Sequence, residues 1–117
     1  MYSWDNYLED VNARLENGDT KLHQVSRNPS KYEGKRLVAN ALLNAGFDTN
    51  IKNDFVMSPL HYAAESGDIV IVILLILHGS IINVIDIYGL SPLDYAIMNG
   101  HNIVADYLVR NGAFRRW

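Results

Sequence analysis

Four histidines are the side chains with which this 117-residue sequence could bind a metal ion or transfer a proton. They are His23, His61, His78 and His101. No two of them stand four residues apart, as two ligands on one helix face would, and no carboxylate completes a metal-ligand spacing. The sequence therefore predicts no metal site. We expect His78 and His101, which flank predicted helix ends, to be solvated.

Two serines could serve as nucleophiles, because Ser58 precedes His61 by three residues and Ser91 precedes Asp94 by three. Each serine is followed directly by a proline, which is typical of a helix start where the hydroxyl caps free amide groups. A hydroxyl that caps a helix is already engaged. The glycines are spread along the chain and form no phosphate-binding loop, so we expect no enzyme activity and no cofactor.

The composition is that of an ordinary globular chain, with 49% hydrophobic and 20% charged residues. Without cysteine it can form neither disulfides nor thiolate zinc sites. A net charge of −3 argues against nucleic acid as a partner. The acidic start MYSWDNYLED does not read as a targeting signal, so we expect a cytoplasmic, intracellular protein. Delivery into a host cell is an alternative that the sequence leaves open.

A repeat of 33 residues organises the chain. The segment SPLH at 58–61 recurs as SPLD at 91–94, and Gly67 recurs as Gly100. A third copy, GDTKLH at 18–23, fits the same frame with five added residues in a turn-rich stretch. Such self-similarity predicts a stack of identical supersecondary units.

The segments GDTKLHQV, MSPLHYAAESGDIVIVILLILHGSIIN and GLSPLDYAIMNGHNIVADYLVRNGA resemble the ankyrin repeat. The resemblance covers about residues 10–113. It implies an all-α solenoid of three stacked helix-turn-helix units, joined by tips that are β-turns or hairpin-like. We expect a single domain over 1–117, made of an N-terminal cap or truncated unit at 1–9, repeat one at 10–50 with an insertion near 28–32, repeat two at 51–83, and repeat three with a C-terminal cap at 84–117.

The resemblance gives roles to several landmarks. His23 and His61 occupy the motif position whose imidazole ties neighbouring loops together, and Gly67 ends a helix where the chain turns sharply. Three positions depart from the pattern. Lys21 replaces a proline, Asp94 replaces the histidine of the third unit, and Val56 replaces a turn glycine.

The stretch DIVIVILLILHG at 68–79 taken alone favours a strand, because five β-branched residues stand in succession. Its nine apolar residues are too few for a membrane span, which needs about 20. The resemblance instead makes it the second helix of a unit. We expect stacking partners on both sides to override the strand propensity.

Solenoids of this kind bind partners on a concave face made of the tips and first helices. The matching positions are Arg14, Glu16, Asn17 and Asp19 in the first unit, Lys52, Asp54, Phe55, Met57, Glu65 and Ser66 in the second, and Ile85, Ile87, Tyr88, Leu90, Met98 and Asn99 in the third. Aromatic and methionine side chains at such tips are typical of protein interfaces. The alternative is that they pack on one another between adjacent tips.

A second apolar surface is predicted on the outer helices, where the family usually carries charged residues. Its members are Leu37, Val70, Ile73, Leu77 and Ile103. Together they could expose on the order of 300 Å², near the largest patch that a monomer tolerates. We expect a second association surface there, used for self-association or for covering by a segment missing from this sequence. The alternative is that the inserted loop at 28–32 or the tail at 114–117 folds over it.

These observations predict a non-catalytic module that binds a partner protein, inserts into no membrane and contacts no nucleic acid. The alternative is a targeting or regulatory segment of a larger enzyme or effector protein.

Overall fold

The structure, a computed structural model, describes residues 14–15, 17–27 and 33–115. Every regular element in these ranges is a helix. The elements are α2 (Lys21–Arg27), α3 (Glu33–Asn44), α4 (Pro59–Ser66), α5 (Ile69–Leu77), α6 (Pro92–Met98) and α7 (Asn102–Arg110). The predicted cap at 1–9 and the insertion at 28–32 lie outside the described residues.

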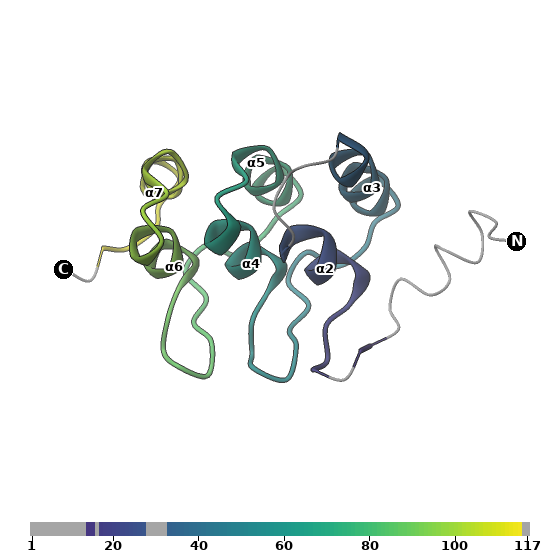
Figure 1. Ribbon diagram of the computed structural model, residues 1–117, viewed down its shortest axis with the longest axis horizontal. Helices are drawn as coiled ribbons and strands as arrows, with labels where there is room; N and C mark the ends of the chain where they lie inside the picture. The colour runs from purple at the N-terminus through teal and green to yellow at the C-terminus, as the bar shows by residue number, and fades with distance from the viewer. Residues whose placement is uncertain (1–13, 16, 28–32, 116–117) are drawn as a thin grey trace, which may run out of the picture.

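The helices form two layers (Figure 1). α2, α4 and α6 lie side by side in one layer, and α3, α5 and α7 lie in the other. The loops that precede α2, α4 and α6 project from the first layer, away from the second. We call them the tips. This arrangement confirms the all-α stack of helix-turn-helix units, and it places the tips and the first helices of all three units along one side of the molecule.

Local chemistry sets both ends of α4. The Ser58 N–H donates to Nδ1 of His61 at 3.0 Å, and Pro59 takes the first helical position, where its missing N–H leaves no bond unmade. The helix ends at Gly67, whose φ of 76° is left-handed and whose N–H donates to the carbonyl of Ala63. The predicted start and end are confirmed.

The prediction of a helix for DIVIVILLILHG is confirmed, and the strand that its local propensity favours is wrong. Asp68 caps α5, because its Oδ1 accepts from the N–H groups of Val70 at 3.1 Å and Ile71 at 3.3 Å. Helix α5 packs on α3, α4 and α7. Ile71, Val72 and Leu75 are fully buried there, so burial on several sides outweighs the helix penalty of β-branched residues.

Leucines at two repeating positions form the core. Leu42, Leu75 and Leu108 stand 33 residues apart in the second helices, and each is 0% exposed. The first helices contribute Leu22, Leu60 and Leu93, which are also buried. Since each unit supplies the same two leucines, the core runs without interruption through the stack.

A buried ion pair joins α3 and α5. Lys35 Nζ lies 3.6 Å from Oδ2 of Asp68, and both side chains are almost fully buried. Burial lowers the pKa of Lys35, and the carboxylate of Asp68 opposes that shift. Removing Asp68 would leave the Lys35 ammonium buried without this counter-ion, whereas removing Lys35 would leave Asp68 with Arg36, whose Nη2 lies 3.6 Å from its Oδ1.

His101 is half-buried, so the expectation that it is solvated is wrong. Its Nε2 lies 2.8 Å from the carbonyl oxygen of Glu65, so the Nε2–H group donates to that carbonyl. Its ring lies over Gly67: a Cβ added there would be 2.5 Å from the ring Nδ1. His78, by contrast, is exposed as expected.

This contact makes two otherwise equivalent glycines unequal. Gly100 has a φ of 71°, close to that of Gly67, but a Cβ added there meets no non-neighbouring atom of the described chain within 4 Å. We expect Gly100→Ala to lower the free energy of unfolding by about 1 kcal/mol through left-handed strain. Gly67→Ala should cost about 1–3 kcal/mol more, because its methyl group displaces the His101 ring. Urea unfolding of both variants measures the difference, and equal losses would contradict the contact.

Candidate interaction surface

The second and third tips are held in shape by one side chain each. Oδ1 of Asn53 accepts from the N–H groups of Phe55 and Met57, both at 2.9 Å. Asp86, at the same position of the next tip, accepts in the same way from the N–H groups two and four residues further on, at 2.9 and 3.0 Å. These bonds satisfy the backbone N–H groups that point into the turn. The side chains at the turn therefore stand on a preformed backbone.

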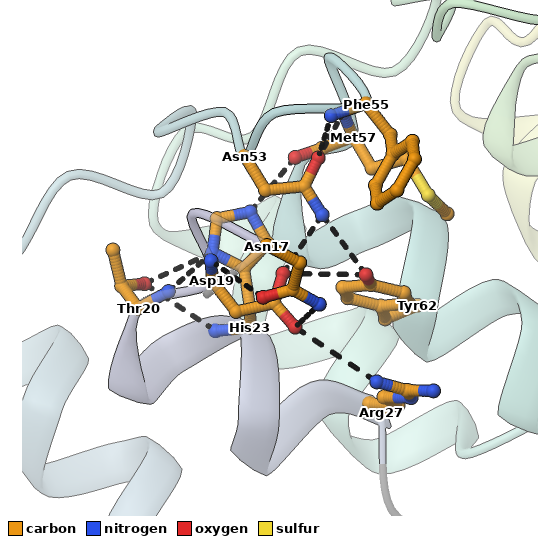
Figure 2. Close-up of polar contacts among 9 residues, drawn as sticks. All are labelled: Asn17, Asp19, Thr20, His23, Arg27, Asn53, Phe55, Met57 and Tyr62. Carbon is orange, nitrogen blue, oxygen red and sulfur yellow. Dashed lines mark hydrogen bonds and ion pairs between the residues drawn. The ribbon is translucent and has the colours of Figure 1, made fainter. Parts of the chain in front are cut away.

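A buried polar cluster lies beneath the second tip (Figure 2). Nδ2 of Asn53 donates to Oδ1 of Asp19 at 2.7 Å and to the Tyr62 hydroxyl at 2.9 Å. That hydroxyl donates to the same Asp19 oxygen at 3.2 Å, and Asn17 Nδ2 donates to its other oxygen at 3.0 Å. Burial, with the Asp19 carboxylate beside it, raises the pKa of Tyr62 to about 12. The cluster ties the first tip to the second tip and to α4.

The third unit repeats this link with one change. The Tyr95 hydroxyl donates directly to the carboxylate of Asp86, and burial raises the pKa of Tyr95. At the position of Asp86 the second unit has Asn53 instead. An aspartate there would set a second carboxylate against Asp19, whereas an amide supplies the two N–H donors that the site uses.

The two motif histidines tie successive units together, as predicted. Nδ1 of His23 accepts from the N–H three residues earlier at 3.1 Å, and His61 makes the same bond at 3.0 Å. Because Nδ1 is the acceptor, the proton lies on Nε2, which donates to a carbonyl of the next tip. The acceptors are Met57 at 2.8 Å and Leu90 at 3.0 Å. Each ring thus caps its own helix and holds the following tip.

Neighbouring tips also bond to each other through the backbone. The Asp54 N–H donates to the Asn17 carbonyl at 2.9 Å, and the Ile87 N–H donates to the Phe55 carbonyl at 2.9 Å. The three tips therefore stand in register along one edge of the stack (Figure 1).

The structure leaves most of the predicted concave positions open to solvent. Exposed are Arg14, Lys52, Asp54, Phe55, Ile85, Ile87, Tyr88, Met98 and Asn99; half-buried are Asn17, Glu65, Ser66 and Leu90; and Glu16 lies outside the described residues. Phe55 is 39% exposed, Ile87 61% and Tyr88 67%, so packing between adjacent tips does not cover them.

Two of the predicted positions are buried, so the prediction that they face a partner is wrong. Asp19 is 2% exposed, because its carboxylate accepts from Asn17, Asn53 and Tyr62. Met57 is 6% exposed and packs in a small apolar cluster with Tyr62 of α4 and with the tyrosine at the same position of α6. Both side chains turn inward to support the tips.

Two exposed side chains that the prediction missed lie on the same side. Arg27 extends along Tyr62, with its Cζ 5.5 Å from the ring centroid and its Nη1 4.0 Å from Oδ2 of Asp19 (Figure 2). Nothing in the repeat pattern marked this arginine. Val56 is 38% exposed at a left-handed φ of 60°, where the other tips have glycine. The sequence shows the missing glycine, but the repeat pattern does not indicate that the valine in its place is exposed.

The outer apolar positions are exposed to different degrees. Leu37, Leu77 and Ile103 are 70%, 73% and 74% exposed, whereas Val70 and Ile73 are half-buried. Of the two segments of this chain that could fold over the row, the loop at 28–32 and residues 116–117 of the tail lie outside the described residues. In the tail, Phe114 is itself 74% exposed.

The described residues offer neither a membrane span nor a cluster of metal ligands. None of their helices combines the length and apolar character needed to cross a membrane. Nor do their histidine and acidic side chains gather in groups of three that could hold a metal ion.

Comparison with known proteins supports the repeat frame. Residues 22–114 match the family model of ankyrin repeats in three copies. The chain is 38% identical over 71 residues to a Dictyostelium discoideum protein named as a probable serine/threonine-protein kinase, which covers 61% of this chain and 8% of that protein. It is 43% identical over 49 residues to a fowlpox virus ankyrin repeat protein, covering 42% of this chain and 7% of the relative.

A third relative is delta-latroinsectotoxin-Lt1a of Latrodectus tredecimguttatus, 34% identical over 76 residues, which cover 63% of this chain and 6% of the toxin. The chain therefore spans less than a tenth of the length of each of these relatives.

The buried histidines should make stability depend on pH. Burial lowers the pKa of His23 and of His61 below the 6.5 of the unfolded chain. As pH falls below 6.5, the unfolded chain binds protons before the folded chain does. The contribution of these two histidines to the free energy of unfolding is therefore fully present above pH 6.5 and is lost progressively below it. Urea midpoints measured from about pH 7.5 to about pH 5.5 should therefore decrease. The exposed His78 supplies the control, since His78→Gln should leave this dependence unchanged; a flat profile in the native chain would contradict the prediction.

Proposed function

The chain belongs to the ankyrin-repeat family, and we propose that it is a non-catalytic module that binds a partner protein on its concave face. This surface comprises the tips and the exposed sides of α2, α4 and α6. The proposal places the module in the cytoplasm and gives it neither nucleic acid nor a membrane as a partner.

The observation that carries the proposal is the exposure of large apolar side chains on locked turns. Tyr88 and Ile87 are 67% and 61% exposed at the third tip, and Phe55 is 39% exposed at the second. A solvated turn gains nothing from such side chains, whereas aromatic and aliphatic anchors dominate binding energy at interfaces. Because Asn53 and Asp86 already fix the turns, binding would have little backbone entropy to overcome.

Strain at the second tip also supports a binding role. Val56 adopts a φ of 60°, which costs a β-branched residue on the order of 1–3 kcal/mol. The other two tips avoid this strain with glycines at φ 79° and 76°. An exposed valine in an unfavourable conformation fits a contact residue better than it fits a structural one.

The polar end of the surface lies on the first unit and on part of the second. Nη1 of Arg14 donates to the carbonyls of Gly18 at 3.0 Å and Lys52 at 2.6 Å. Arg27 is 57% exposed and is held along the Tyr62 ring. Positioned cations of this kind favour specificity and association rate more than affinity.

A second candidate function is that of a targeting or regulatory segment in a larger enzyme or effector protein. It is favoured by the length of the relatives, of which the chain spans 6–8%, and by the kinase named among them. In that case the same concave face would position another domain of the protein.

A third possibility concerns the outer face, where Leu37, Val70 and Ile103 occupy the same position in successive units and Ile73 and Leu77 continue along α5. A regular apolar row of this kind can meet its own copy across a twofold axis. We include self-association through this row in the proposal.

Alanine substitutions test the concave face. Phe55→Ala and Tyr88→Ala should each weaken partner binding by about 1–3 kcal/mol and change stability little, because both side chains are exposed anchors. Phe114→Ala removes an aromatic ring that is 74% exposed at the end of the chain, and it should bind normally. Partners are captured from a cytosolic extract, identified by mass spectrometry and titrated against all three variants. If the tip variants capture and bind as the native chain does, the concave face is not the binding surface.

Sedimentation velocity at rising concentration tests the outer row. The native chain should shift from monomer to dimer, and Leu77→Lys combined with Ile103→Glu should remain monomeric, because charged side chains cannot be buried there without partners. Ile81→Lys changes an isoleucine outside the row that is 57% exposed, and it should dimerise as the native chain does. A native chain that stays monomeric throughout would exclude self-association.

A further inference from the structure

Three positions of the concave face are charged in the second unit and apolar in the third. Lys52 corresponds to Ile85, Asp54 to Ile87 and Glu65 to Met98, each 33 residues later. The three apolar replacements are 54%, 61% and 62% exposed. At a fourth position, Phe55 and Tyr88, both units carry an aromatic ring. The surface therefore changes from charged to apolar across a single repeat.

The apolar part of the surface is also free of exposed charge. Between Ile69 and Ala105 the only aspartate, glutamate, lysine or arginine residues are Asp86 and Asp94. These two are 5% and 1% exposed. The third tip and α6 thus present no charged side chain to a partner.

An uncharged surface of this kind excludes partners that are recognised through charge. Phosphate groups and acidic segments are held by arginine and lysine, and the third unit offers neither on its concave face. The favourable contribution here is the removal of apolar surface from water. The partner must bring apolar side chains to the third unit.

The spacing of the units distinguishes between two shapes of partner. Helices α4 and α6 pack side by side, and packed helices lie about 8–10 Å apart. Phe55 and Tyr88 occupy the same position of successive units, so about the same interval is expected between them. Seven residues of a helix rise about 10 Å and return to nearly the same face. Three residues of a strand also rise about 10 Å, but the side chains of residues i and i+3 point to opposite faces. A helix matches the interval with like side chains, and a strand does not.

Building on the proposed function, we propose that the concave face binds an amphipathic α-helix of a partner protein, whose apolar side chains recur every seven residues. The helix lies along the row of tips. Its apolar residues contact Tyr88, Ile87 and Met98, while its polar end meets the mixed charges of the first and second units. Recognition at the third unit is independent of salt, because it involves no ion pair.

The second unit supplies the residues for a matched test. Ile87→Asp and Met98→Glu place in the third unit the residues that the second unit carries at the same positions, so the backbone tolerates them. Ile81→Asp makes the same chemical change at a position outside both proposed surfaces that is 57% exposed, and it serves as the control.

The probe is a single displayed pool of segments about 21 residues long, or three heptads, selected on the full chain. One third of the pool carries apolar residues in a heptad pattern, one third carries them in strict alternation, and one third is acidic. The heptad sequences should be enriched. Ile87→Asp and Met98→Glu should weaken binding of the enriched peptides at least about tenfold, and Ile81→Asp should leave it unchanged.

Enrichment of the alternating or acidic sequences, or of none, would overturn the inference, as would equal effects of the three substitutions. Capture of the chain by neutral phosphatidylcholine vesicles, abolished by Ile87→Asp, would show that the apolar surface serves a lipid instead. These failures differ from failure of the proposed function. The proposed function itself would fail if partners captured from an extract bound the Phe55→Ala and Tyr88→Ala variants as tightly as they bind the native chain.

Discussion

The stack depends on a hydrogen-bonding side chain that acts in two directions. At His23 and His61 the imidazole accepts a backbone N–H of its own helix start and donates to a carbonyl of the next tip, and both rings are 0% exposed. Neutral imidazole is the side chain that offers one acceptor and one donor on opposite edges of a rigid ring. Desolvation keeps it neutral, so the same burial that hides the ring also preserves the donor and acceptor that it needs.

The polar groups next to this link restrict one another. Asp19 turns inward and thereby demands donors, which Asn53 and Tyr62 provide, and Asn53 in turn holds the backbone of its tip. In the next unit no buried carboxylate occupies the position of Asp19, because Met57 stands there, and Asp86 can replace the amide. The choice between amide and acid at the tip is therefore set by the neighbouring unit, which a pattern read within one repeat does not reveal.

This dependence between units explains how far the sequence predicted the structure. Helix starts at Ser58 and Ser91 and the end at Gly67 were predictable, because proline, capping serine and glycine act on the backbone within a few residues. Helix α5 was predictable only from the repeat frame, since its own composition favours a strand. The inward turn of Asp19 and the contact of His101 with Glu65 join residues about 35 positions apart, and no local rule contains them.

Each unit has a buried side whose residues repeat from unit to unit and an exposed side whose residues vary. Inside, leucines and polar side chains that both donate and accept hydrogen bonds repeat with little change. Asp94 is the exception: its carboxylate accepts from the Ser91 N–H at 2.8 Å but has no N–H to donate to a further tip. Outside, the third unit replaces three charged residues of the second with isoleucine and methionine, and it keeps Asp86 and Asp94, the acidic groups of its tip and first helix, buried. Because the inner network and the backbone hydrogen bonds between tips hold the tips in register, the outer positions can change from charged to apolar within one repeat without altering the backbone that displays them.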